Sequence, residues 1–111
     1  MILGFIGTGK ISSSIIYGIF NSSLKIKTIY ISSRNKNIAK KLTKKFRQVK
    51  ILKDNQEIIN KSSTIILGVT PNVGNKILPK LTFSKNKKII SLISTINLEK
   101  LKKITKNKNI V

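Results

Sequence analysis

The stretch Gly4-Phe5-Ile6-Gly7-Thr8-Gly9-Lys10-Ile11-Ser12 stands at the start of a chain of 111 residues and decides its fold. A short apolar run ends at Ile6, a Gly-x-Gly turn follows, and the residues after it have helical spacing. This order of strand, glycine turn and helix is the fingerprint of a dinucleotide-binding unit. Gly7 permits the tight turn, Gly9 lets the backbone approach a pyrophosphate, and the small Ser12 takes the third glycine position. The alternative is an ordinary strand-to-helix turn.

Predicted strands and helices alternate along the whole chain. The apolar pattern predicts strands at 2–6, 28–31, 49–52, 64–69 and 88–93, and the start of a sixth at 109–111. Helices are predicted at 10–21, 36–46, 54–59, 71–80 and 98–104. Such alternation is typical of an α/β domain with a parallel sheet. We therefore expect one Rossmann-like domain over residues 1–111, with helices on both faces and a ligand at the carboxyl ends of the strands.

Two local expectations follow from the same pattern. In the first helix the apolar side chains at helical spacing should face the core, and these are Ile11, Ile15, Ile16, Ile19 and Phe20. Before the third helix, Asp54 and Glu57 have the spacing of a capping box, in which each side chain bonds to the other's backbone N–H.

The composition excludes several kinds of chemistry. The chain has no Cys and no His, which excludes disulfides, Cys/His zinc sites, thiol nucleophiles and histidine bases. Its three acids, Asp54, Glu57 and Glu99, all lie at predicted helix starts, so no carboxylate pair is available for acid–base catalysis. No catalytic residue and no metal can be named. The remaining interpretation is cofactor chemistry, with a hydride passed to an acceptor such as a protonated imine.

The net charge is +20, from 23 basic and 3 acidic residues. Nucleic-acid binding is the first interpretation of such a charge. However, the basic residues are nearly all Lys and are spread along the chain, and Lys, Asn and Ile are abundant together, as in A/T-rich coding sequence. No specific nucleic-acid partner is therefore expected. No run approaches the roughly 20 apolar residues that span a bilayer, and no signal peptide is evident, so a cytoplasmic protein is expected without a membrane partner.

The cofactor preference is predicted from the end of the second strand. In folds that bind NAD, an acidic residue about 20 positions beyond the glycines accepts hydrogen bonds from the ribose. The first acidic residue here is Asp54, and Ser32, Ser33 and Arg34 stand where the acid is expected. Hydroxyls and a guanidinium suit a 2′-phosphate. We therefore predict NADP(H) over NAD(H), with a plain polar turn over residues 32–35 as the alternative.

These residues resemble the pyrroline-5-carboxylate reductase family, whose members reduce an imine with NADPH in the last step of proline synthesis. Residues 4–11 are similar to the start of that family, and Asp54-Asn55-Gln56-Glu57 to its Asn-x-Glu helix start. Leu67-Gly68-Val69-Thr70-Pro71 is similar to its Ala-Val-Lys-Pro segment, and residues 90–92 and 96–101 to its fifth strand and following helix. The resemblance covers essentially the whole chain.

The resemblance implies a set of cofactor-binding residues. The pyrophosphate would be bound by Ile6, Gly7, Thr8, Gly9, Lys10 and Ile11. Ser33 and Arg34 would face the 2′-phosphate, and Asn55 would lie near the adenosine ribose, with helix capping as its alternative role. Val69, Thr70 and Pro71 would line the nicotinamide half, with plain strand core as the alternative for Val69.

Two departures from the family are visible. Thr70 stands where the family has Lys, and Ile93-Ser94-Thr95 replaces a segment of small residues near the expected nicotinamide. The family also carries a C-terminal helical domain that forms a homo-oligomer and most of the imine pocket. Residues 1–111 stop short of it, as a piece of a longer protein, a proteolytic product or a short gene product. They are expected to bind cofactor without turning over substrate alone.

Three alternative functions remain open at the level of sequence. The chain can be another NADP-dependent oxidoreductase of the same superfamily, of the deazaflavin-dependent type. It can be a non-catalytic nucleotide-binding module, or a basic nucleic-acid binder whose affinity would have to persist at physiological salt.

Overall fold

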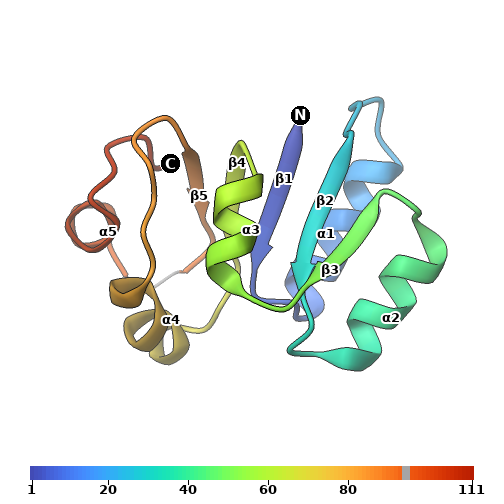
Figure 1. The fold of residues 1–111 in the computed structure, drawn as a ribbon, viewed down its shortest axis with the longest axis horizontal. Helices are drawn as coiled ribbons and strands as arrows, with labels where there is room; N and C mark the ends of the chain where they lie inside the picture. Colours follow the sequence, from blue (N-terminus) through green and yellow to red (C-terminus); the bar gives the residue numbers. More distant parts are fainter. Residues whose placement is uncertain (94–95) are drawn as a thin grey trace.

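The computed structural model describes residues 1–93 and 96–111, which form one sheet with helices around it (Figure 1). The strands are β1 (Ile2–Ile6), β2 (Thr28–Ser32), β3 (Val49–Leu52), β4 (Thr64–Leu67) and β5 (Lys88–Ser91). All four pairings are parallel, and the order across the sheet is β3-β2-β1-β4-β5. After β1 the chain adds β2 and β3 on one side of it, and then crosses over to add β4 and β5 on its other side. The predicted Rossmann-like parallel sheet is confirmed, with its switch point beside β1.

Helices cover both faces of this sheet. They are α1 (Lys10–Phe20), α2 (Lys36–Lys45), α3 (Asn55–Lys61), α4 (Pro71–Ile77) and α5 (Leu98–Thr105), with a short 3₁₀ helix at Leu78–Lys80. Successive residues of a strand point to opposite faces, so Phe5 packs in one core with Ile16 of α1 and Leu42 of α2. Ile6 packs in the other core with Ile58 of α3. In Figure 1, α1 lies behind the sheet and α3 in front of it.

Several elements are shorter than the sequence predicts. Strand β4 ends at Leu67 and β5 at Ser91, and the predicted sixth strand is reduced to one parallel bridge between Ile89 and Ile110. The predicted helix over 71–80 ends as an α-helix at Ile77 and finishes as the 3₁₀ helix. Pro79 contributes to this change, because proline has no N–H to donate to the carbonyl four residues before it.

The prediction for Ile11 is wrong. Its side chain is 68 % exposed, whereas Ile16 is fully buried. The buried stripe of α1 runs through Ser12 and Ile16, four residues apart. Ile11 is one position, or about 100°, away from that stripe and therefore faces outward.

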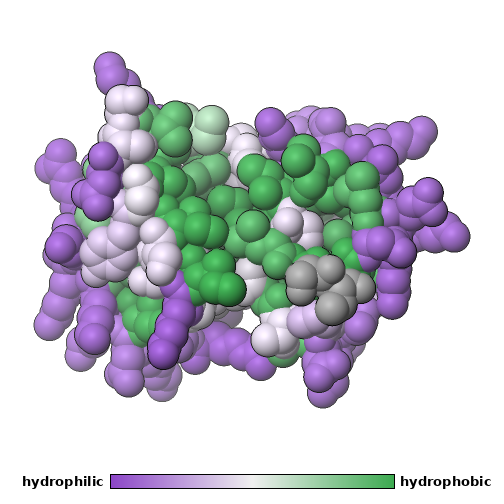
Figure 2. Space-filling model, turned by 180° about the vertical axis from the view of Figure 1, so that it is seen from behind, coloured by the Kyte–Doolittle hydropathy of each residue, from purple (hydrophilic) through white to green (hydrophobic). Residues whose placement is uncertain are grey.

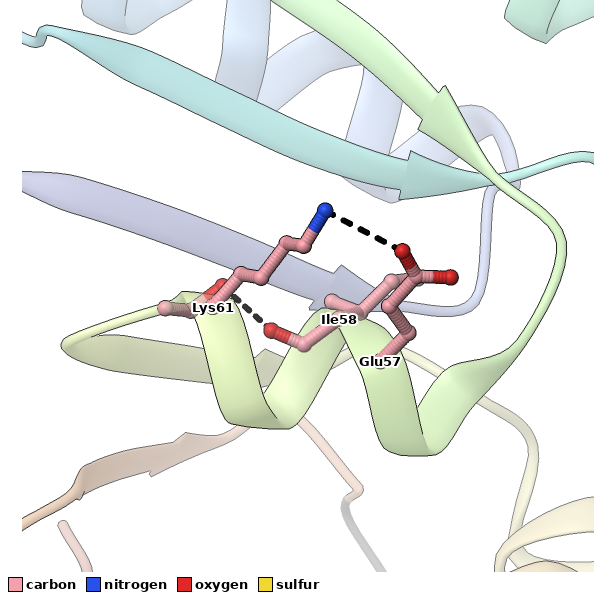
Figure 3. A network of polar contacts seen from close by, with 4 residues as sticks. Glu57, Ile58 and Lys61 are labelled. Atoms are coloured by element: carbon pink, nitrogen blue, oxygen red, sulfur yellow. Dashed lines mark hydrogen bonds and ion pairs between the residues drawn. The ribbon is translucent and has the colours of Figure 1, made fainter.

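The predicted capping box is half right. Asp54 caps α3, since its Oδ1 accepts a hydrogen bond from the backbone N–H of Gln56 at 3.1 Å. Glu57 does not return to the cap. Its carboxylate instead forms an ion pair of 3.1 Å with Lys61 Nζ one turn later (Figure 3). The spacing of four residues places these two side chains on the same side of the helix.

The opposite view of the molecule shows how its polar surface is distributed. In Figure 2, apolar side chains gather over the middle of this face, and hydrophilic side chains surround them. The hydrophilic side chains therefore do not form a single stripe on this face.

No helix within the described residues has the length and apolar character needed to cross a membrane.

Candidate dinucleotide-binding site

A groove runs along the carboxyl ends of the strands. It consists of three adjoining cavities of about 650, 460 and 420 Å³. We call them the central cavity, the β2–β3 cavity and the β4–β5 cavity, after the strand ends that line them. Val69 lines all three, Gly7 and Arg34 are shared by the first two, and Gly9 and Thr70 are shared by the central and β4–β5 cavities. The shared residues make the cavities one continuous groove, the position at which such sheets bind ligands.

The two glycines of the loop have different structural roles. Gly7 has a φ of +100°, and a Cβ added there would lie 2.6 Å from the carbonyl oxygen of Gly68. Gly9 has extended backbone with a φ of −108°, and an added Cβ would meet nothing within 4 Å. Gly7 is therefore required by the fold itself. At Gly9 the absent side chain leaves open space beside the groove, which a ligand's pyrophosphate can use.

Ser12 explains how the helix lies so close to the sheet without a third glycine. Its side chain is 1 % exposed, and a Cβ added to Gly68 would lie 2.5 Å from its Oγ. Gly68 itself donates a backbone hydrogen bond of 2.9 Å to the carbonyl of Ile6. A small residue at position 12 and no side chain at position 68 together allow α1 to begin over the end of β4.

Thr8 ties the glycine loop to the end of β2. It is buried, and its Oγ1 donates a hydrogen bond of 3.0 Å to the carbonyl oxygen of Ser32 and lies 3.0 Å from Ser32 Oγ. Ser32 borders the β2–β3 cavity while its hydroxyl contacts Thr8. The two predicted binding segments are thus linked before any ligand is present.

We expect Thr8→Val to lower the free energy of unfolding by about 1–3 kcal/mol, because it leaves the buried Ser32 carbonyl without its donor. Urea unfolding measures this change. Thr43→Val is the matched control, since Thr43 Oγ1 donates a hydrogen bond to the carbonyl of Lys40 at an exposed place on α2. Equal losses in the two variants would contradict a linking role for Thr8.

The β2–β3 cavity brings together the ends of two strands. Ser33 and Arg34 line it from the segment after β2, and Lys53, Asp54 and Asn55 line it from the segment after β3. Sequence analysis missed Lys53, because one Lys among 23 basic residues carries no signal of its own. Asp54 also brings a carboxylate into the lining of this cavity. The Asp54 carboxylate is already used to cap α3.

The structure also separates the alternatives for Asn55. Asp54 is the cap and Asn55 is the first residue of α3, so the capping role considered for Asn55 is wrong. Val69 lies beyond the end of β4, where it is half-buried against the core and also lines the groove, and its place at the nicotinamide half stays a prediction. Thr70 caps α4 by accepting a hydrogen bond of 3.4 Å from Val73 N, and Pro71 begins that helix.

The β4–β5 cavity has mainly apolar walls. Ile11 and Lys10 line it from α1, Thr70 and Pro71 from the segment after β4, and Ile93 from the segment after β5. Ile93 is buried, with its Cδ1 only 3.2 Å from a Cβ added to Gly74. The large side chain expected at position 93 therefore lies between α4 and the β4–β5 cavity. Ser94 and Thr95 lie outside the described residues.

The family is decided by a comparison with protein-family models. Residues 2–97 match the family described as NADP oxidoreductase, coenzyme F420-dependent. The chain belongs to that NADP oxidoreductase family. The chain is therefore an NADP-binding domain.

Two plant proteins are similar to this NADP oxidoreductase domain in sequence. The pyrroline-5-carboxylate reductases of Glycine max and Arabidopsis thaliana are each 28 % identical to it over 101 residues. The alignments cover 89 % of this chain and 37 % of each relative. The chain thus spans about two fifths of the length of the relatives it matches.

Solved structures agree in fold. The 1-pyrroline-5-carboxylate reductase of Streptococcus pyogenes matches with a TM-score of 0.79 and 28 % identity, over 99 % of this chain and 40 % of that one. The Plasmodium falciparum pyrroline carboxylate reductase with NADP bound matches with a TM-score of 0.76 and 24 % identity, over the same shares. A prephenate dehydrogenase from A. aeolicus matches with a TM-score of 0.80 at 16 % identity, over 99 % of this chain and 40 % of that one. The last two show the fold alone.

Proposed function

We propose that this chain is the NADPH-binding domain of an imine reductase of the pyrroline-5-carboxylate reductase type. The observation that carries the proposal is the groove in which the open space at Gly9 and the guanidinium of Arg34 border the same central cavity. A dinucleotide that carries a 2′-phosphate has anionic groups for both places. The reductases of similar sequence support the choice of an imine as the acceptor.

The residues of the groove fit such a cofactor. In this proposal the loop of Ile6, Gly7, Thr8, Gly9, Lys10 and Ile11 holds the pyrophosphate. Ser33 and Arg34 hold the 2′-phosphate, with Ser32 fixing their strand end to Thr8, and Asn55 lies at the adenosine ribose. Val69, Thr70 and Pro71 line the nicotinamide half. When bound, NADPH supplies the hydride.

The chain's own residues orient the ligand and exclude water from the reacting end. The apolar side chains of Ile11, Pro71 and Ile93 wall the β4–β5 cavity, and removal of water strengthens electrostatic interactions there. A protonated imine is already electrophilic, so this domain need not supply a proton at that end. In the proposal, the rest of the imine pocket and the homo-oligomer contacts come from a C-terminal helical domain beyond residues 1–111, and these residues alone do not turn over the imine.

The central test is a calorimetric titration of the chain with NADPH and with NADH, each at two salt concentrations. We expect tighter binding of NADPH that survives added salt, because a site built from directed hydrogen bonds is screened less than diffuse surface charge. Binding of neither dinucleotide, or a preference for NADH, would contradict the proposal.

Arg34→Gln should lower NADPH affinity by about 10- to 100-fold, the range for a lost charge-assisted contact to phosphate, and leave NADH affinity unchanged. Calorimetry with both dinucleotides measures this difference. Arg47→Gln is the matched control, because it removes the same charge at an exposed position that lines none of the three cavities. An equal loss in Arg47→Gln would mean that net charge alone attracts the cofactor.

The family description favours a second candidate, in which the domain exchanges a hydride between NADP and a deazaflavin coenzyme. The longer protein carrying this domain would then reduce NADP with the reduced deazaflavin and would leave 1-pyrroline-5-carboxylate unchanged. Parallel assays with the two substrates separate the candidates.

A further inference from the structure

We propose that Lys53 is a second cationic ligand of the 2′-phosphate, so that selection of NADPH depends on the ends of two strands. Lys53 would bind from the end of β3, opposite Arg34 at the end of β2. This inference rests on the proposed function and names one further residue of its specificity site.

The register of the sheet brings Lys53 to this place. Ser32 of β2 is paired with Leu52 of β3, so the next residues, Ser33 and Lys53, leave the sheet side by side. Neighbouring strands lie about 4.8 Å apart, which is within the reach of one phosphate group. Ser33, Arg34 and Lys53 all line the same cavity of about 460 Å³.

The charges of that cavity indicate why a second cation is needed. Its lining includes Arg34, Lys53 and the carboxylate of Asp54. Without Lys53, the charges of Arg34 and Asp54 would cancel, and the cavity would have no net attraction for a phosphate dianion. With Lys53, the cavity keeps one net positive charge beside the carboxylate.

Lys53 is also available for this role. It is exposed, and within the described residues its ammonium takes part in no hydrogen bond or ion pair. Asp54 caps α3 through its Oδ1, and no ion pair joins it to Lys53 within the described residues. Arg and Lys contribute differently to such a site: the guanidinium binds phosphate through a planar fork, and the ammonium adds a mobile point charge.

The test uses adenosine 2′,5′-bisphosphate and adenosine 5′-monophosphate, which differ by the 2′-phosphate and lack the nicotinamide. In calorimetry, Lys53→Gln should weaken binding of the 2′,5′-bisphosphate by about five- to tenfold and leave binding of the 5′-monophosphate unchanged. Lys50→Gln is the control, since Lys50 is an exposed lysine of β3, three residues before Lys53, that lines none of the groove cavities.

A second substitution is expected to change the affinity in the opposite direction. Asp54→Asn removes the negative charge of the cavity and keeps the cap, because Asn caps helices as well as Asp does. We expect it to tighten binding of the 2′,5′-bisphosphate about two- to fivefold, with no change for the 5′-monophosphate.

The outcomes separate this inference from the proposed function. If Lys53→Gln and Lys50→Gln have equal effects while Arg34→Gln still removes the preference, the role of Lys53 is overturned and the NADPH-binding function stands. If the unmodified chain binds the 2′,5′-bisphosphate and the 5′-monophosphate equally well, or binds neither, both proposals are overturned.

Discussion

Replacing Gly9 with alanine is expected to weaken NADPH binding by about 10- to 100-fold, the effect of forcing an extra methyl group into a close contact. The backbone of Gly9 is extended, with a φ of −108°, and an added Cβ would meet no protein atom within 4 Å. The methyl group would instead occupy space that borders the central and β4–β5 cavities. The free energy of unfolding should therefore stay within about 1 kcal/mol of the unmodified chain.

Calorimetry with NADPH and urea unfolding are measured on the same sample. Gly18→Ala is the control, because Gly18 lies within α1, away from the groove, and an added Cβ there also meets nothing within 4 Å. That variant should bind NADPH normally and gain about 0.5–1 kcal/mol from the better helix propensity of alanine. Normal NADPH binding by Gly9→Ala would contradict the placement of the pyrophosphate at this loop.

Replacing Gly7 with alanine should instead damage the fold, by about 2–4 kcal/mol of unfolding free energy, and abolish NADPH binding with it. Two costs add at this position. A φ of +100° is strained for any residue with a Cβ, and the methyl group would lie 2.6 Å from the Gly68 carbonyl oxygen and 2.8 Å from Val69 Cγ1. The oxygen belongs to the backbone, so it cannot move aside without shifting the end of β4.

A second substitution separates the destabilisation caused by the overlap with Val69 from that caused by the backbone. In the Gly7→Ala background, Val69→Ala removes the side-chain overlap but neither the backbone overlap nor the strain in φ. We expect urea unfolding to show at most a partial recovery, of about 1 kcal/mol. Full recovery, or a Gly7→Ala chain as stable as the unmodified one, would show that the loop does not depend on glycine.

The glycine loop could be predicted from sequence because residue type alone restricts what it can do. At Gly7 the positive φ and the nearby backbone of Gly68 leave no room for a side chain. A glycine at this position therefore indicated the tight turn. The same holds for Pro71 and for Asp54, whose side chains favour particular positions at a helix start. At these positions the local chemistry decides the structure, and the structure agrees.

Other features of the site depend on contacts between segments that are far apart in the sequence, and the sequence alone did not predict them. The orientation of Ile11 is set by the packing of Ser12 beneath Gly68, a contact across more than half of the chain. The place of Lys53 is set by the register of β3 against β2, which no local pattern encodes. Because lysines are so common in this chain, only the register of the sheet distinguishes Lys53 from the others as a neighbour of Arg34.

The central position of β1 has a consequence for how the chain emerges from the ribosome. Strands β2 and β3 follow β1 closely, but its other neighbour arrives late: Ser63, just before β4, bonds to Ile2 across 61 residues. Until then one edge of β1 has no partner, and open strand edges are prone to pair wrongly. Because the loop at Gly7 rests against Gly68 and Val69, the nascent chain cannot complete its groove before β4 has been made.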